Sequence, residues 1–202
     1  MKLPNDTRTN ILDVAQDLVQ RQSISGVSFQ DLAKRIGIKK GSMYYHFETK
    51  DELSVALVDR VANQLQESFV LGESKPARRR LDYFLAIYLK HIEVGAQLCT
   101  GGAFVGEWGG LTSPVQAAVK RLFTIQLRGL TAIIEAGATT GEFDLKGREP
   151  DTLAHWVLAT VQGGLLISRV MGDTQPLRDS VAMVKAYFEI DPDPGAQHPL
   201  KT

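Results

Sequence analysis

The sequence predicts an all-α protein of about nine helices, with three small N-terminal helices and a larger helical body. Apolar residues recur at intervals of three and four through most of the chain, which is the period of an amphipathic helix. The alternation that marks a half-buried strand is nearly absent. Gly37 ends one periodic segment, and three prolines open later ones, as expected at helix boundaries: Pro114, Pro150 and Pro176.

The three small helices are expected within residues 1–50. The first has one apolar face, made of Ile11, Ala15, Leu18 and Val19. The second follows Ser28, a residue type suited to cap a helix N-terminus, and ends at Gly37. A third, brief helix is expected over residues 41–47.

A connecting helix is expected over residues 51–71, with Thr49 as its cap and two acidic residues in its first turn, where negative charge favours the helix dipole. The stretch LGESKP, residues 71–76, then marks a boundary. The body should span residues 72–190, with a short helix in the glycine-rich stretch QLCTGGAFVGEWGGLTSP and longer helices around it. Residues 191–202 contain three prolines and are expected to be disordered.

Composition excludes several classes of protein. No apolar run reaches the length of about 18 residues that a membrane span needs, and the N-terminus lacks a secretory apolar segment, so a cytoplasmic protein is expected. A single cysteine excludes an internal disulfide framework, and the four scattered histidines show no ligand spacing, so neither metal nor cofactor is expected. The net charge is zero, but residues 1–50 hold eight Lys or Arg against five Asp or Glu.

Two short helices joined by a tight turn, after a longer helix, describe a helix-turn-helix, whose second helix enters the DNA major groove. Within residues 41–47, Met43 and Phe47 share one face and should pack inward. The other faces and the entrance of this helix carry Lys39, Lys40, Gly41, Ser42, Tyr44, Tyr45 and His46. Cations and hydroxyls suit phosphates and base edges, so this surface predicts DNA binding. A hydrolase built on Ser42 and His46 is excluded, because both would point to solvent with no third group orienting the histidine.

The stretch from residue 26 to residue 53 resembles the N-terminal signature of the TetR (tetracycline-repressor) family of bacterial transcription regulators. The matching features are Gly26, Ser28, Leu32-Ala33, Gly37, Gly41-Ser42, Tyr44, His46-Phe47, Lys50 and Leu53. The resemblance implies that Ser28 and Lys50 bind phosphates and that Gln30 reaches a base. It also implies that Lys40 and Gly41 read the sequence, while four neighbours contact the backbone or base edges: Ser42, Tyr44, Tyr45 and His46. Ser28 stands where threonine is commoner, which is a mild change.

The resemblance further implies a homodimer in which the last two helices of each subunit form a four-helix bundle. The residues expected at this contact are Val157, Val161, Gly164, Leu165, Ser168, Leu177, Val181, Val184 and Phe188. The alternative is that these residues pack inside one subunit. A dimer would present two DNA-binding surfaces related by a two-fold axis, which suits a palindrome.

Aromatic and apolar residues of the body could line a cavity for a small, mostly apolar effector. The candidates are Tyr83, Phe84, Ile87, Tyr88, His91, Cys99, Phe104, Trp108, Phe123, Leu127 and Trp156. The alternative for each is ordinary helical core. Cys99 precedes an expected helix start, and a helix N-terminus favours the thiolate, so an electrophilic effector that modifies Cys99 is a second hypothesis. An ordinary buried cysteine is the competing interpretation.

The sequence therefore predicts a ligand-responsive transcriptional regulator, of a kind that most often represses, with DNA, an effector and a second copy of itself as partners. One alternative is a small helical enzyme acting on an apolar substrate in the body. It would need a catalytic group there, and Cys99 and His91, the only candidates, have no visible partner. The other alternative is a helical interaction protein without a DNA target.

Overall fold

The computed structural model describes residues 7–93, 95 and 97–190, and the expectation for residues 191–202 lies outside them. Within the described residues all regular structure is helical, which confirms the all-α fold. The elements are α1 (Thr7–Gln22), α2 (Phe29–Ile36), α3 (Lys40–His46), α4 (Lys50–Leu71), α5 (Ala77–Glu93), α6 (Thr100–Val105), a 3-10 turn (Trp108–Gly110), α7 (Ser113–Thr140), α8 (Pro150–Met171) and α9 (Gln175–Tyr187). None of these helices is long and apolar enough to cross a membrane.

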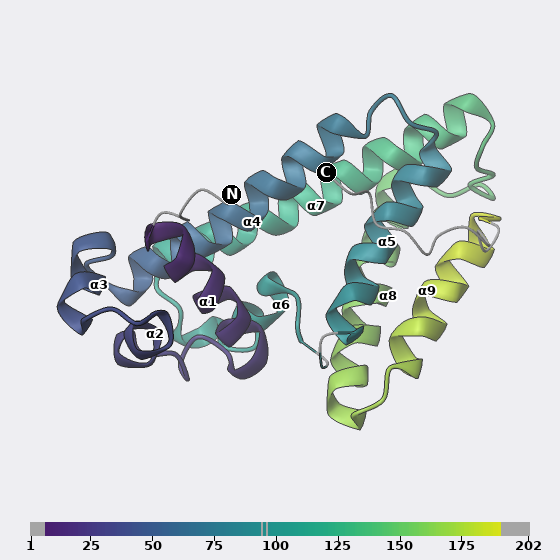
Figure 1. Cartoon of the computed structure of the whole chain (residues 1–202). Helices are drawn as coiled ribbons and strands as arrows, with labels where there is room; N and C mark the ends of the chain where they lie inside the picture. Colours follow the sequence, from purple (N-terminus) through teal and green to yellow (C-terminus); the bar gives the residue numbers. More distant parts are fainter. Residues whose placement is uncertain (1–6, 94, 96, 191–202) are drawn as a thin grey trace, which may run out of the picture.

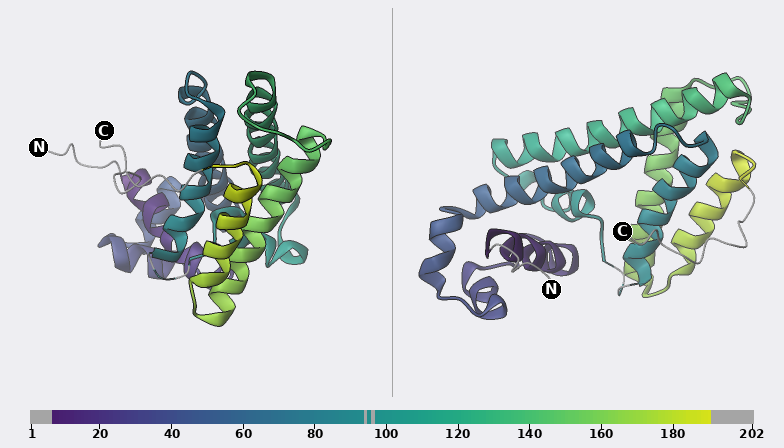
Figure 2. Two further views of the ribbon diagram at one scale, coloured as in Figure 1. Left: turned by 90° about the vertical axis from the view of Figure 1, so that its right-hand side faces the viewer. Right: turned by 45° about the horizontal axis from the view of Figure 1, so that its top comes forward.

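The molecule has a small helical head at one end and a larger helical body at the other (Figure 1). We use "head" for α1–α3 and "body" for α5–α9. The long helices α4 and α7 pack side by side and join the two ends, and α5, α8 and α9 pack together beyond them (Figure 2). The short helix α6 lies against α1, so the body also reaches the head directly.

The helix ends follow the local signals that the sequence carries. The hydroxyl oxygens of Ser28 and Thr49 accept hydrogen bonds from the backbone N–H groups of Asp31 and Glu52, both at 3.1 Å, which confirms the two predicted caps. Gly37 adopts φ +81°, and its N–H donates to a carbonyl of α2, as glycine commonly does at a helix end.

Two helices of the body end where the backbone turns left-handed. The helix α7 continues to Thr140 and stops before Gly141, which has φ +74°. The last helix, α9, ends at Tyr187. Glu189 stands at φ +52°, a left-handed conformation that a helix cannot contain, so the chain must leave the helix there.

The buried side chains form two cores that do not separate head from body. The first core lies among α5, α8, α9 and the later part of α7. The second combines the head with α4, but it also contains Phe104 of α6 and four residues from the first half of α7: Val115, Ala118, Val119 and Leu122. Part of the expected body, residues 72–190, therefore completes the core of the head.

Candidate nucleic-acid interface and buried polar cluster

Two apolar side chains hold α3 in the head. Met43 and Phe47 are both 0% exposed and lie on one side of the helix, as the sequence predicts. The guanidinium of Arg8, on α1, lies over the Phe47 ring, 4.6 Å from its centre, which adds a cation–π contact. These contacts fix α3 against α1 and leave its other faces on the outside of the head.

The outer side of α3 carries the seven residues that the sequence assigns to DNA contact. Six are exposed and His46 is partly buried. A Cβ at Gly41 would meet nothing within 4 Å, so the backbone at the start of α3 is open to close approach. Tyr44 packs edge-on against Phe29 of α2, with ring centroids 5.3 Å apart, whereas Tyr45 is 88% exposed. Two lysines, a serine and a tyrosine thus share one open surface.

The three other residues implied by the resemblance flank this surface in different ways. Gln30 is exposed on α2. The Ser28 hydroxyl is exposed but already donates to the Asp31 carboxylate at 2.6 Å, so capping uses part of its hydrogen-bonding capacity. The ammonium of Lys50 donates to the backbone oxygen of Ser25 at 3.2 Å. Lys50 therefore ties α4 to the loop between α1 and α2 in this structure.

The same loop is also tied to the body. Glu107, which follows α6, accepts hydrogen bonds from the backbone N–H and the hydroxyl of Ser25, at 3.1 and 3.0 Å. Partial burial acts to raise the pKa of Glu107, but hydrogen bonds from Ser23 and Ser25 together with the charge of Lys50 lower it. The charged form of the Glu107 carboxylate is thus favoured where the body contacts the head.

A second contact between head and body lies at the C-terminal end of α1, where the last carbonyls of a helix lack partners within the helix. The guanidinium of Arg169, on α8, donates to the backbone oxygen of Gln20 at 2.9 Å and to that of Arg21. The Gln20 side chain donates to the hydroxyl of Thr100, the first residue of α6, at 3.3 Å. The Arg169 cation therefore stabilises the negative end of the α1 dipole, and the start of α6 contacts the Gln20 side chain beside it.

The nine residues expected at a dimer contact are all buried within the single chain: Val157, Val161, Gly164, Leu165, Ser168, Leu177, Val181, Val184 and Phe188. They form the contact between α8 and α9 and the adjoining core. A Cβ at Gly164 would lie 2.4 Å from the Ser180 hydroxyl oxygen, and the Leu177 N–H donates to the Ser168 hydroxyl at 3.0 Å. Side chains that their own chain covers have no surface left for a partner, so for these nine the structure favours packing inside one subunit.

A different set of apolar side chains remains exposed on the same two helices. They are between 50% and 73% exposed: Leu166, Ile167, Val170 and Met171 on α8 and Met183 on α9. Gly163, Ile167 and Val170 follow one another at helical spacing and share one side of α8. Sequence reasoning missed this set because α8 is apolar on two sides. The presence of two such sides was the signal that one of them stays uncovered.

The eleven candidates for an effector pocket do not line one cavity. Tyr83 is 49% exposed, and Phe104 and Trp108 belong to the core of the head. The remaining candidates in or beside the first core are Phe84, Tyr88, His91, Cys99, Phe123, Leu127 and Trp156, while Ile87 is partly buried on α5.

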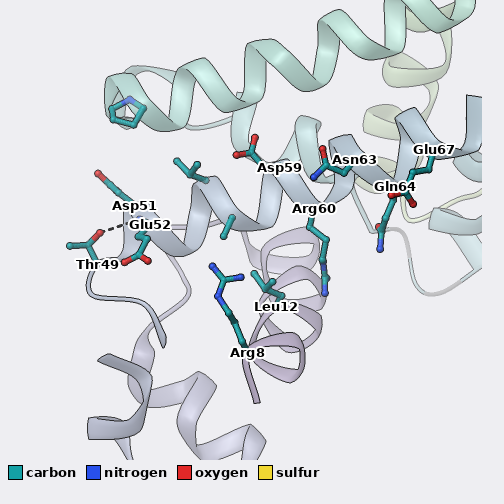
Figure 3. A pocket seen from close by; sticks show the side chains of 13 residues that line it. Arg8, Leu12, Thr49, Asp51, Glu52, Asp59, Arg60, Asn63, Gln64 and Glu67 are labelled. Carbon is teal, nitrogen blue, oxygen red and sulfur yellow. Dashed lines mark hydrogen bonds between the residues drawn. The ribbon is translucent and has the colours of Figure 1, made fainter. Parts of the chain in front are cut away.

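A hollow of about 930 Å³ lies elsewhere, between α1, α4 and the start of α7 (Figure 3). Most of the residues that line it are polar or charged, among them Arg8, Asp59 and Arg60, and none of the eleven candidates contributes to it. A smaller hollow of about 320 Å³ on α7 and α8 includes one candidate, Leu127.

A hydrogen-bonded cluster of polar side chains lies at the meeting of α5, α6, α7 and α8. The Gln162 side-chain N–H donates to the Tyr88 hydroxyl at 3.1 Å, and the Cys99 thiol donates to the Gln162 amide oxygen at 3.2 Å. Gln126 on α7 is 7% exposed and hydrogen-bonds to Tyr88 through its side chain. We call these four residues the buried polar cluster. Tyr88 and Cys99 were predicted as pocket residues from the sequence, whereas neither glutamine was, although Gln126 interrupts the apolar stripe of α7.

Burial sets the protonation states around this cluster. It raises the pKa of Tyr88 well above its ordinary value and lowers the pKa of His91 to about 4. It also raises the pKa of the Cys99 thiol, even though the Gly102 N–H donates to the sulfur at 3.2 Å. The expectation that the start of α6 favours a thiolate does not hold in this structure, because desolvation outweighs the hydrogen bonds. Among the described residues, Cys99 hydrogen-bonds to Gln162 and Gly102, and neither is a base that would make the thiol a nucleophile.

Two stretches of the chain match models of known protein families. Residues 11–57 match the family described as bacterial regulatory proteins, tetR family. Residues 77–184 match the domain described as Tetracyclin repressor-like, C-terminal domain, and this match alone covers more than half of the 202 residues.

Individual proteins are similar over nearly the whole chain. The HTH-type transcriptional repressor DhaR from Mycobacterium sp. (strain GP1) is 26% identical over 180 residues, which cover 88% of this chain and 89% of that protein. The HTH-type transcriptional repressor NemR from Escherichia coli (strain K12) is 24% identical, with 90% and 93% covered. The crystal structure of a TetR transcriptional regulator from Legionella pneumophila superposes with a TM-score of 0.80 at 26% identity, covering 92% of this chain and 98% of that one.

Proposed function

Because the chain belongs to the tetR family of bacterial regulatory proteins, we propose that it is a ligand-responsive transcriptional repressor that binds a palindromic DNA operator as a homodimer. Binding of a small, mostly apolar effector in the body would release it from the DNA. The repressor DhaR, similar along almost the whole chain, supports repression as the sign of regulation.

The observation that carries this proposal is the open surface of α3. Its entrance holds the cations of Lys39 and Lys40, which suit phosphates or guanine edges. Gly41 permits close approach of the backbone, and the exposed Tyr45 offers a hydroxyl beyond it. The same helix is anchored from behind by Met43 and Phe47, so these groups are presented by a rigid support.

We place the dimer contact on the exposed apolar side of α8 and α9. Ile167 and Val170 would lie at its centre, since both are at least half exposed on one side of α8, and Gly163 would allow a partner helix to approach closely. Exposed apolar side chains that lie together on a surface often mark an interaction site, whereas single scattered ones do not. This surface is on the end of the molecule away from α3 (Figure 1), so a dimer leaves both DNA-binding surfaces free.

Release from DNA would be transmitted through the contacts between body and head. An effector that moves α6 or α8 would also move α1, because Thr100 and Arg169 both hold the end of that helix. A coupling free energy of about 1–3 kcal/mol would change operator affinity by roughly 5- to 150-fold.

An electrophilic effector that modifies Cys99 is a second candidate, since a modified sulfur would disturb the contacts of Cys99 with Gln162 and Gly102. Its burial and raised pKa weigh against fast reaction. Replacing Cys99 by serine should abolish induction by electrophiles if this candidate is right. Unchanged induction by every electrophile tested would exclude it.

Fluorescence anisotropy with duplexes from the DNA beside the gene tests the DNA-binding proposal. We expect a palindromic site, bound more weakly as salt rises. Lys40→Ala should lose about 1–3 kcal/mol of operator affinity and relax specificity if Lys40 contacts a base, or reduce the salt slope by about 1 if it contacts a phosphate. Lys75→Ala, at an exposed body position, is the matched control. Absence of sequence-specific binding by the wild type would contradict the proposal.

Sedimentation at micromolar concentration tests the dimer. The wild type should sediment as a dimer, and the double variant Ile167→Asp with Val170→Asp as a folded monomer, because two carboxylates would have to be buried without partners. A monomeric wild type would contradict the dimer contact without affecting the assignment of the DNA-binding surface.

A further inference from the structure

The buried polar cluster contains one hydrogen-bonding atom without a partner. Gln126 is 93% buried, and its side-chain oxygen Oε1 accepts no hydrogen bond. Buried polar atoms are almost always paired, because leaving one unpaired costs the hydration that it has lost. In a protein that binds an effector, such an atom at the meeting of four helices indicates where a ligand supplies the missing donor.

The chemistry around Oε1 restricts what that donor can be. The hydrogen bonds of the cluster join neutral side chains: a phenol, a thiol and amides. The imidazole of His91, whose ring lies edge-on to that of Tyr88, is neutral at physiological pH because burial lowers its pKa to about 4. A ligand carboxylate would therefore lose its hydration without meeting a cation, and an ammonium would lose it without meeting an anion.

Aromatic side chains lie beside the cluster. The ring of Phe84 lies 5.4 Å from that of Tyr88, centre to centre, and Phe123 is half-buried one turn before Gln126 on α7. A primary amide on the ligand would bring a second N–H and an oxygen that need partners of their own. A hydroxyl supplies the single donor and adds no other unpaired donor.

We propose that the buried polar cluster is the polar end of the effector site and that it takes a small neutral ligand, aromatic or alicyclic, whose hydroxyl donates to Gln126 Oε1. This inference rests on the proposed function, since it names the chemical class of the effector.

The position of the cluster also connects it to the head. Cys99 caps α6, whose first residue holds Gln20 of α1, and a Cβ at Gly101 would lie 2.9 Å from the Phe123 ring. A ligand that enters beside Gln126 and Phe123 thus acts next to the first turn of α6. A movement of α6 caused by the ligand would reach the end of α1 through the hydrogen bond between Thr100 and Gln20.

Matched pairs of compounds test the hydroxyl requirement with the full-length protein. The probes are phenol against anisole, benzyl alcohol against benzyl methyl ether, and cyclohexanol against methoxycyclohexane, with benzoate as the charged probe. Titration calorimetry and thermal shift are measured for the wild type, for Gln126→Leu and for Gln66→Leu, which makes the same substitution at an exposed position of α4.

We expect at least one alcohol to bind the wild type roughly tenfold more tightly than its ether, because only the alcohol can fill the empty acceptor. Gln126→Leu should remove this preference, because leucine offers no acceptor to the ligand hydroxyl. Gln66→Leu should keep the preference.

Three results with the wild type would overturn the inference: ethers that bind as tightly as their alcohols in every pair, no binding by any probe, or benzoate binding more tightly than the alcohols. A preference that survives in Gln126→Leu would overturn it as well. Operator binding by the same samples is measured separately. Loss of operator binding by the wild type would contradict the proposed function, whereas loss of the alcohol preference contradicts the inference alone.

Discussion

The head and the body use polar side chains in opposite ways. On α3 the lysines, serine and tyrosine lie outside, and apolar Met43 and Phe47 hold the helix from within. In the body, the side chains of Tyr88, Gln126 and Cys99 are buried between packed helices, and apolar side chains such as that of Val170 remain on the surface. A solvated polar surface costs little and suits a charged partner, whereas a buried polar group is costly unless it finds a specific partner. This contrast supports the proposed roles, in which the head binds DNA and the body binds an effector.

The largest effect is expected from breaking the support of α3. Phe47→Ala should destabilise the head by about 3–5 kcal/mol, because it removes a fully buried ring and leaves a cavity. Operator binding should be lost with it, as measured by urea unfolding and anisotropy. Tyr45→Ala, on the exposed side of α3, is the matched control. Since this ring is 88% exposed, the free energy of unfolding should change by no more than about 0.5 kcal/mol, while DNA affinity falls. Equal loss of stability in both variants would contradict the division into an inner and an outer side.

The burial of His91 in the body is tested by the dependence of protein stability on pH. The folded pKa of His91 is about 4, below the unfolded value of 6.5, so the unfolded chain binds the proton more readily. Stability is therefore fully present above pH 6.5 and is lost as pH falls toward 4. Between about pH 7 and pH 5 the loss should be about 2 kcal/mol.

Urea unfolding of the wild type and of His91→Asn across this range measures the effect. The variant should show a flatter pH profile. The pKa values of Glu107 and Glu142 are lowered in the folded protein, so these carboxylates lose their contribution only at lower pH and do not confuse the comparison. A variant profile as steep as that of the wild type would show that His91 is not buried in its neutral form.

The smallest effect is expected where the two regions meet. Arg169→Met removes the hydrogen bonds from the α8 guanidinium to the end of α1 and should weaken operator binding about fivefold, near 1 kcal/mol, because the head is then less firmly held. Dimerisation should be unchanged in sedimentation. Arg148→Met, at an exposed site before α8, is the control. Operator affinity equal to that of the wild type would indicate that α6 alone positions the head.

The sequence predicted the head well because its signals are local. Ser28, Gly37 and Thr49 act within one helical turn, and the inward direction of Met43 and Phe47 follows from their spacing. The body was harder because burial there is decided between helices distant in sequence. The apolar stripe of α8 that includes Val161 is covered by its own chain, and only the packed structure shows which stripe remains free. Gln162, the partner that Tyr88 and Cys99 share, likewise lies more than 60 residues away from each of them in sequence.

The shared core of the head has a consequence for protein engineering. Because α6 and the first half of α7 fill the interior of the head, a chimera that exchanges only residues 1–71 would leave Phe104 and Leu122 facing a foreign partner. Transplanting the operator specificity of one regulator onto the sensing body of another should succeed more often when the outer residues of α3 alone are changed. The unit of exchange is thus a surface of a few side chains, rather than the N-terminal segment of the gene.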